Sequence, residues 1–594
     1  MHSLLGQGLA YHQAGRLAEA ERCYRTLLQQ NPNDPNALHL LGMVAQAVNE
    51  HESAVQLIRR AIAISPGVAM FHNNLGAALR RMGDLPAARE SYRRAVQLQP
   101  DYPEAWANLG TLLRDQTRLV DSLAAYEQAL RRRDLPAIRA AMATTLRDMG
   151  RIEEAIEHYR RALAADPTMA DQHANLCFTL HASDRVTPQE IFDEHVAWAR
   201  RHADSLTAWA PPHENDRDPQ RRLRIGYVSA DLRDHAVAKF LAPLLDHRNR
   251  ERFEVICYSG VSRPDAVTAS IQSRADGWRE IASLTDAQLA DLIRRDCIDV
   301  LVDLAGHTNG TRLLAFARKP SPVQFTYLGY PDSSGMTAMD WRISDAVADP
   351  PGMTDRWHTE QIARVDGCFL AYPLPPDLPP LTPPPAMNGG FVTFGSFNNL
   401  SKISPATLAL WRDVLSAVPA SRMLIKASMF EDPATRDLSA RRVADAGLPM
   451  DRVQLLPPVR GQNTHLETYA RIDIALDTFP YNGTTTTCEA LAMGVPVISL
   501  YGSHHVSRVS LSLLSAAGFP RWATDKPQRF IEIACDLAAD VSTLAELRGG
   551  MRRRLEASAL CDGVRLTRGV EEVYRNAWRR WCVGEAKENC PHGH

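Results

Sequence analysis

The chain has 594 residues, too many for a single hydrophobic core, so about three or four domain-sized units are expected. Its 45% apolar and 23% charged residues are typical of a globular protein. With 67 basic and 69 acidic residues the formal charge is −2, which excludes a whole-protein electrostatic attraction to nucleic acid or to an anionic membrane.

The ten cysteines are scattered and include no C-x-x-C pair, so neither a zinc site nor a disulfide framework is indicated. No apolar run is long enough to span a bilayer. The N-terminal residues also lack the basic region and long apolar core of a signal peptide. We therefore predict a cytoplasmic protein without a membrane span.

Residues 1–182 show an internal repeat. Three sets of small residues or prolines recur every 34 residues: Gly8, Gly42, Gly76 and Gly110; Pro32, Pro66 and Pro100; Ala20, Ala54 and Ala88. A fixed period of this length predicts a stack of helix pairs. The pattern resembles the tetratricopeptide repeat, with five repeats over residues 1–169 and a partial sixth through about Leu180.

The repeats depart from the family pattern at a few positions. Asn49 and Thr117 stand where Gly15, Gly83 and Gly150 are expected to turn the chain. Stacked helix pairs leave an extended concave surface, which favours a groove for docking acceptor proteins or peptides. A scaffold that only positions another domain is the alternative.

A helical linker is predicted over residues 183–222, and the pattern changes after it. Over residues 223–372, strand-like runs alternate with helical segments, which predicts a parallel sheet covered by helices. The predicted strands are Leu223–Ser229, Phe253–Tyr258, Ile298–Leu304, Val323–Leu328 and Trp341–Ser344. Polar or glycine-containing loops follow three of them, at 234–235, 306–310 and 329–335. Such loops are expected to share a pocket at the carboxyl edge of the sheet.

Residues 373–390 are rich in proline and are predicted to form a stiff connection. A second α/β unit is predicted over 391–560, with a final helix and tail over 561–594. Its expected strands are Phe391–Gly395, Met423–Ile425, Val453–Leu456, Ile472–Leu476 and Val495–Leu500. Two α/β units with a cleft between them predict the GT-B arrangement, although the composition allows other two-domain enzymes.

The segment 481–489, Tyr-Asn-Gly-Thr-Thr-Thr-Thr-Cys-Glu, connects the last two of these strands. As a strand-to-helix turn it would direct backbone N–H groups, hydroxyls and the positive end of a helix dipole toward one small volume. That arrangement suits an anion such as a diphosphate. An ordinary capped helix that binds nothing is the alternative.

Four ordered motifs extend the comparison to most of the chain. They are the runs at 223–231, 328–335, 397–403 and 477–486. Together with the upstream repeats they resemble O-GlcNAc transferase, and the chain is identified as a bacterial-type member of glycosyltransferase family 41. The resemblance implies an α-superhelical repeat array followed by a GT-B enzyme built from two Rossmann-like α/β domains.

The resemblance also implies an activity. This is transfer of N-acetylglucosamine from UDP-GlcNAc to serine or threonine hydroxyls of proteins recruited by the repeats, with inversion and with no metal or other cofactor. The only D-x-D triplet, at 216–218, lies in the linker, which argues against metal-dependent transfer. The alternatives are a related enzyme with another sugar or an asparagine acceptor, or a UDP-binding scaffold with little turnover.

Site residues follow from the same resemblance. Lys402 is implied as the catalytic cation at the diphosphate, and His235 as either the general base or a substrate-positioning group. Thr485 and Thr486 are implied to contact the diphosphate. The other implied donor and acceptor contacts are Asn399, His465, Thr484, Glu489, His307, Thr308, Tyr330, Pro331 and Gly335.

Three positions near the donor differ from the family pattern. Glu489 stands where the family has an aspartate near the ribose, and Thr484 replaces a family histidine. Gln462 falls about where a family lysine contacts the donor. These changes leave donor affinity and donor specificity open.

Overall fold

The computed structural model describes residues 2–459 and 462–584, with side chains for residues 4–459 and 465–584. The chain divides into two compact units. The first contains residues up to Met149 together with 157–165 and 431–435, and the second contains the rest. Residues 166–182, which the repeat pattern groups with the array, therefore belong to the second unit.

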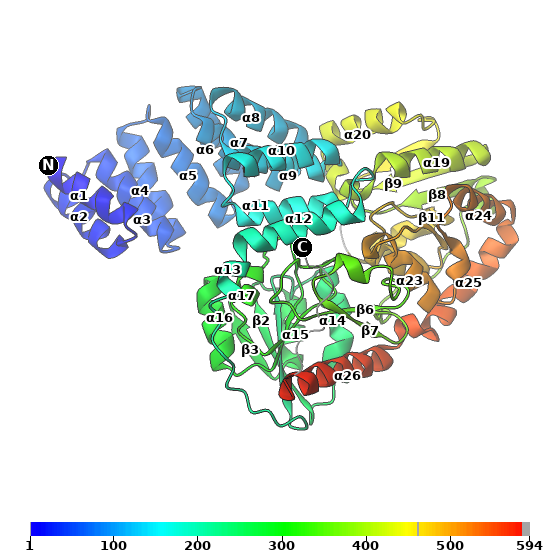
Figure 1. Ribbon diagram of the computed structural model, residues 1–594. Coiled ribbons are helices and arrows are strands. Elements are labelled where there is room, and N and C mark those ends of the chain that lie inside the picture. Colours follow the sequence, from blue (N-terminus) through cyan, green and yellow to red (C-terminus); the bar gives the residue numbers. More distant parts are fainter. Residues whose placement is uncertain (1, 460–461, 585–594) are drawn as a thin grey trace. The chain divides into compact units, whose positions relative to one another are not determined.

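Helix pairs form the repeat array, and from the first helix to the ninth each packs against the next along the chain (Figure 1). Their bounds are α1 His2–Gln13, α2 Leu17–Gln30, α3 Pro35–Ala47, α4 His51–Ile64, α5 Ala69–Met82, α6 Leu85–Leu98, α7 Pro103–Asp115, α8 Leu119–Arg132, α9 Pro136–Asp148 and α10 Ile152–Ala165. The structure therefore confirms the helix pairs that the period of 34 residues predicts.

The repeated glycines lie where the two helices of a pair are closest. A Cβ atom added to Gly76 would lie 2.8 Å from the ring of Tyr92, and one added to Gly110 would lie 3.0 Å from Tyr126. Because real Cβ contacts are longer, only glycine fits without moving the aromatic ring.

The turn between paired helices requires a left-handed backbone. Gly15 and Gly83 have φ of 72° and 84°, and Asn49 and Thr117 adopt the same conformation with φ of 65° and 59°. Glycine recurs at this position because it adopts positive φ without steric cost. The two substituted repeats keep the turn despite their side chains.

The first sheet of the second unit is parallel, in the order β3-β2-β1-β4-β5-β6-β7. Its strands are β1 Leu223–Ser229, β2 Phe253–Ser259, β3 Gly277–Glu280, β4 Val300–Asp303, β5 Val323–Thr326, β6 Trp341–Asp345 and β7 Gln361–Val365. The accompanying helices are α14 Ala236–His247, α15 Ala266–Arg274, α16 Asp286–Arg295 and α17 Leu313–Ala317. All five predicted strands are present.

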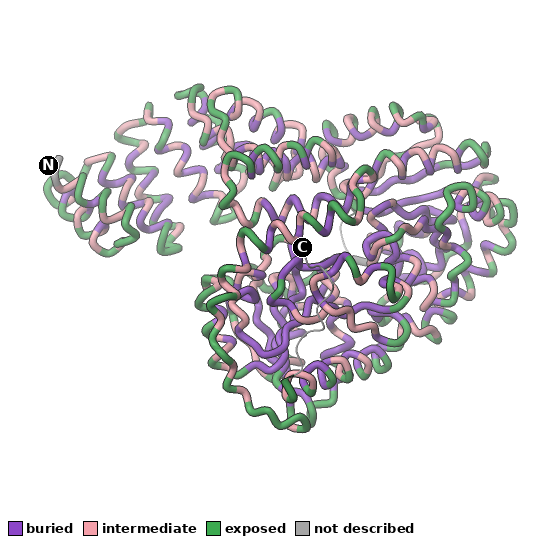
Figure 2. Tube along the Cα trace, viewed as in Figure 1, coloured by how far each residue is buried: buried purple, intermediate pink, exposed green. Residues whose placement is uncertain are grey.

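The second sheet is also parallel, in the order β10-β9-β8-β11-β12-β13. Its strands are β8 Val392–Ser396, β9 Ser421–Lys426, β10 Val453–Leu456, β11 Ile474–Leu476, β12 Val497–Leu500 and β13 Ala523–Thr524. Its main helices are α19 Pro405–Ala417, α20 Pro433–Asp445, α21 Gln462–Glu467, α22 Thr485–Ala492, α23 Val509–Ala516, α24 Pro527–Ala539 and α25 Val541–Glu556. Figure 2 shows the central strands of both sheets as buried.

Several segments join the two α/β halves within this unit. The other helices of this unit are α11 Ala170–Leu180, α12 Pro188–His202 and α13 Asp204–Thr207 before the first sheet, α18 Ala386–Gly389 between the two sheets, and the final helix α26 Gly563–Cys582. The last helix returns to the first half, where it packs against α14 and β7 (Figure 1). Thr567 Oγ1 donates to the Pro243 carbonyl at 3.1 Å, and Trp578 Nε1 donates to the Asp218 carbonyl at 3.1 Å. Across the described part of the chain, no helix has the length and apolar character needed to cross a membrane.

Candidate active site

A buried carboxylate organises the turn between β11 and α22. Asp477, at the end of β11, is only 3% exposed. It accepts hydrogen bonds from the backbone N–H groups of Thr478 and Gly483, each at 2.8 Å. It also accepts from Ser499 Oγ at 2.8 Å and Asn398 Nδ2 at 3.2 Å. These bonds join the turn to β12 and to the loop after β8, and they hold its backbone in place.

The start of α22 is open to an anion. Thr484 occupies the N-cap position but its side chain makes no capping hydrogen bond. The first N–H groups of an α-helix have no partner within the helix, and they carry its positive dipole end. Thr484, Thr485 and Thr486 are all half-buried, so this end of the helix remains accessible.

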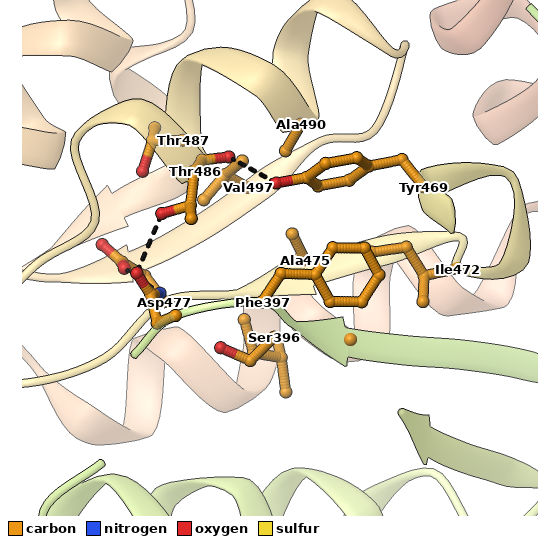
Figure 3. Close-up of a pocket in the computed structure, with 13 residues that line it drawn as sticks. Ser396, Phe397, Tyr469, Ile472, Ala475, Asp477, Thr486, Thr487, Ala490 and Val497 are labelled. Atoms are coloured by element: carbon orange, nitrogen blue, oxygen red, sulfur yellow. Dashed lines mark hydrogen bonds between the residues drawn. The ribbon is translucent and has the colours of Figure 1, made fainter. Parts of the chain in front are cut away.

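A small pocket lies beside the turn (Figure 3). Its lining includes Phe397, Asp477 and Tyr469. The Tyr469 hydroxyl donates to the Thr486 carbonyl at 3.2 Å, and Thr486 Oγ1 donates to Asn398 Oδ1 at 2.8 Å. The hydroxyl of Thr486 is thus oriented by Asn398, which Asp477 in turn holds.

Lys402 lies against the same turn. It ends a short 3-10 helix, Leu400–Lys402, that follows β8. Its Nζ donates to the Asn482 carbonyl at 2.9 Å and lies 3.9 Å from the centre of the Tyr481 ring. Burial lowers the pKa of Lys402 to about 8, while Asp477 acts in the opposite direction. Among the described residues no carboxylate pairs with this ammonium group, so its charge is available to an anion at α22.

His465 and Glu489 are brought together deeper in the site. His465 Nε2 lies 3.0 Å from Glu489 Oε2, and its Nδ1 contacts Lys426 Nζ. Glu489 is 5% exposed and also accepts from the Tyr469 hydroxyl at 3.4 Å. Burial tends to raise the pKa of Glu489, but the hydrogen bond from His465 and the charge of Lys239 outweigh it and lower the pKa. The predicted contact of Glu489 with a ribose stays a prediction.

The first half contributes α14 to this region. Lys239 of α14 reaches Glu489 with an Nζ to Oε1 distance of 3.5 Å. One turn earlier, His235 is the N-cap residue of α14, and its Nδ1 accepts from the Val237 N–H at 3.3 Å. Burial lowers the pKa of His235, although the nearby Asp231 opposes this effect. His235 is therefore neutral at pH 7 and remains exposed beside the donor half.

His307 and Tyr330 lie in a buried cluster, and their predicted contacts on the sugar and acceptor side stay predictions. His307 is fully buried and its Nε2 donates to the Ser334 carbonyl at 2.9 Å. The Tyr330 hydroxyl lies 2.6 Å from His195 Nε2 and 3.1 Å from His181 Nε2. His195 Nδ1 is hydrogen-bonded to a carbonyl, so its Nε2 accepts from Tyr330. Both residues pack under α12, which covers their loops.

Gly335 also serves this packing. A Cβ atom there would lie 2.3 Å from the carbonyl oxygen of His195, and its φ is +75°. The close approach that the glycine permits is to the backbone of α12. The predicted contact of Gly335 with substrate stays a prediction.

The remaining predicted residues are more accessible. Thr308 and Pro331 are half-buried, and Thr308 Oγ1 donates to the Ala305 carbonyl at 2.7 Å. Asn399 is exposed next to Lys402. The side chain of Gln462 lies outside the described residues, as do residues 585–594 of the predicted tail.

Four polar residues of the site received no role from the sequence: Asp477, Asn398, Lys426 and Lys239. Asp477 and Asn398 belong to motifs that the resemblance covers, so their positions carried a usable signal. Lys426 is the last residue of β9, at the carboxyl edge of the sheet where ligands collect. Lys239 follows His235 by four residues, which places both on one face of a helix.

Comparison with known families agrees with this architecture. Glycosyl transferase family 41 matches residues 167–371 and 386–569, more than half of the chain. The family described as Cilia and flagella-associated protein 70 C-terminal domain matches residues 1–209, over the helical repeats.

Individual relatives and a solved structure show the same similarity. A rice (Oryza sativa subsp. japonica) protein named Probable UDP-N-acetylglucosamine--peptide N-acetylglucosaminyltransferase SPINDLY is 39% identical over 431 residues, covering 71% of this chain and 46% of the relative. The tomato (Solanum lycopersicum) protein of the same name is 38% identical, with the same coverage of each chain. This chain thus spans about half the length of these curated relatives.

The structure of a mutant O-GlcNAc transferase from Thermobaculum terrenum is 35% identical in sequence. It superimposes with a TM-score of 0.70 and covers 98% of each chain, so the likeness includes both the repeats and the two α/β halves. On the family match and this full-length similarity, the chain belongs to glycosyl transferase family 41.

Proposed function

We propose that this chain transfers N-acetylglucosamine from UDP-GlcNAc to serine or threonine hydroxyls of proteins, with inversion at the anomeric carbon and without a catalytic metal or further cofactor. The names of the rice relative and of the Thermobaculum enzyme support this activity. The observation that carries the proposal is the position of Lys402 at the open start of α22, where no carboxylate of the described residues pairs with its ammonium group.

The geometry suits a displacement at the sugar. The acceptor hydroxyl attacks the anomeric carbon and loses its proton to solvent, while the bond from that carbon to the diphosphate oxygen breaks. Negative charge then grows on the diphosphate, and Lys402 together with the free N–H groups of α22 stabilises it. Both are held before the reaction, Lys402 by the Asn482 carbonyl and α22 by Asp477, so little reorganisation is needed.

His235 fits a positioning role better than that of general base. Its Nδ1 lone pair accepts the Val237 N–H at the start of α14. In a neutral ring the proton then resides on Nε2, which can donate a hydrogen bond but cannot accept the hydroxyl proton. We propose that His235 orients substrate through this N–H group.

We further propose that the concave surface of the repeat array binds the acceptor proteins. Nine described cysteines are free, which supports a reducing compartment, and we propose the cytoplasm.

Incubation of the full chain with labelled UDP-GlcNAc and candidate acceptor proteins tests the activity. We expect transfer that chelators leave unchanged, and a loss of at least about 100-fold in Lys402→Met. Lys526→Met, at an exposed lysine, is the matched control and should retain activity. Mass spectrometry of the product distinguishes serine or threonine from asparagine, and competition with other nucleotide sugars tests the donor. UDP binding without any transfer would instead support the scaffold alternative.

A further inference from the structure

We propose that Lys426 is a positioning residue that fixes His465 as the neutral tautomer with its proton on Nε2, so that the ring offers only its face to the donor. The inference rests on the proposed function in one respect, namely that the donor carries a planar base. Nothing in the family match or in the named relatives assigns a role to Lys426.

Three side chains surround the imidazole of His465 in a fixed order. Lys426, 5% exposed at the end of β9, contacts Nδ1 through its Nζ. Glu489 Oε2 lies 3.0 Å from Nε2 on the other side of the ring. The ring of Tyr469 meets His465 edge to face, with 6.0 Å between the centroids and 81° between the planes.

The chemistry of these neighbours determines where the proton resides. A lysine ammonium has three donors and no acceptor, so His465 Nδ1 must present its lone pair to Lys426. An ionised carboxylate only accepts, so Nε2 must carry the proton that it donates to Glu489. A doubly protonated ring would direct an N–H group at the ammonium of Lys426, and the opposite tautomer would mismatch both neighbours.

The charges around the ring support this assignment. Burial lowers the pKa of Lys426 to about 8, and Glu489 opposes that effect, so the ammonium form prevails at pH 7. Glu489 is ionised at that pH and has a second cation, Lys239, 3.5 Å from its Oε1. Among the residues whose side chains the structure describes, the charged or titratable groups that face His465 are Lys426, Glu489, Tyr469 and, beyond the carboxylate, Lys239.

This arrangement limits how His465 can recognise a ligand. Both ring nitrogens are bonded to protein groups, so neither is available to the edge of a nucleobase. The side chain is still 34% exposed, which leaves ring surface for stacking. Stacking tolerates any base because every base has a π face. His465 therefore contributes affinity for the base of the donor but does not select which base is bound.

The tautomer can be measured directly by NMR of the full chain with ¹⁵N-labelled histidine, with the His465 signals assigned from their loss in His465→Gln. We expect the neutral ring to be the Nε2–H tautomer in the unmodified chain and in Lys426→Arg, since arginine also only donates. In Lys426→Met the share of the Nδ1–H tautomer should rise, because no donor then requires the lone pair of Nδ1. A wild-type ring with its proton on Nδ1, or a tautomer ratio that is identical in Lys426→Met, would overturn the proposal.

Binding measurements test the stacking role. We expect His465→Ala to weaken UDP binding by about 10-fold, within the range reported for stacking on one base, and to leave inorganic pyrophosphate binding unchanged. GDP and CDP binding, where measurable, should weaken by a similar factor. A loss for UDP alone among the nucleotides would show that His465 reads the base edge and would contradict the inference.

Neither measurement requires sugar transfer. Absence of transfer in a chain that shows the Nε2–H tautomer and base-independent losses would therefore count against the proposed activity alone.

Discussion

Lys239 of α14 and Glu489 of α22 form an ion pair across the two α/β halves, with 3.5 Å between Nζ and Oε1. Lys239 lies one helical turn after His235, and Glu489 lies one turn after Thr485. The pair thus joins the two helices whose N-termini carry the candidate substrate-positioning histidine and the anion site. An aspartate at position 489, shorter by one methylene, would reach less far toward Lys239. The glutamate therefore favours this ion pair.

Lys239→Met and Glu489→Asp break the same ion pair. We therefore expect the free-energy loss calculated from kcat/KM to be smaller in the double variant than the sum of the losses in the two single variants. Lys239 is about one third exposed, so solvent screening limits the coupling to roughly 0.5–1 kcal/mol. A double-mutant cycle on kcat/KM measures this coupling, with Lys526→Met as the control. Fully additive effects would show that the ion pair does not contribute to kcat/KM.

Asp477 offers a second test, because its hydrogen bonds hold the turn. In Asp477→Asn an amide NH2 group replaces one carboxylate oxygen. This donor then faces the backbone N–H or hydroxyl donors from which the oxygen accepted hydrogen bonds. We expect the free energy of unfolding to fall by about 2–4 kcal/mol and UDP affinity to fall at least 10-fold. Calorimetry and UDP titration measure the two effects. Asp525→Asn, at an exposed position, should change neither.

Buried histidines predict an acid-sensitive second unit. Burial lowers the pKa of His181 to about 3, although the nearby Asp332 opposes the shift. Between pH 6.5 and 3 the unfolded chain binds a proton here that the folded chain does not, so stability is lost as pH falls through this range. From pH 6.5 to 5 this one residue contributes a loss of about 2 kcal/mol.

Urea unfolding at pH 7.5, 6 and 5 measures that dependence. His181→Gln removes the titrating group. Between pH 7.5 and 5 the free energy of unfolding of this variant should therefore change by about 2 kcal/mol less than that of the unmodified chain, even if the variant is less stable at every pH. An unchanged pH dependence would mean that His181 is protonated in the folded protein.

The repeat array can be tested at its closest helix contact. Gly76→Ala places a methyl group 2.8 Å from the Tyr92 ring, and we expect it to destabilise the array by about 1–3 kcal/mol. At Gly67 an added Cβ meets no atom within 4 Å. Gly67→Ala should therefore be neutral or stabilise slightly, by about 0.4–1 kcal/mol. Thermal unfolding of both variants provides the comparison.

Local patterns in the sequence predicted much of the fold. The period of 34 residues predicts the helix pairs, because each pair repeats the same packing of glycine against an aromatic or aliphatic side chain. Buried strands such as β1 and β4 were predicted because their runs are almost wholly apolar. The strands β3, β7 and β13 were missed, since they are short or lie toward the sheet edges and are only partly buried.

The sequence by itself determined most of the helices and strands and the strand-to-helix turn before α22, because these depend on residues close together along the chain. Only the tertiary structure decided the contacts of Lys426 with His465 and of Lys239 with Glu489, and the burial of His307 under α12. Such contacts join residues far apart in sequence, and they depend on how whole helices and sheets pack. No local periodicity encodes that packing.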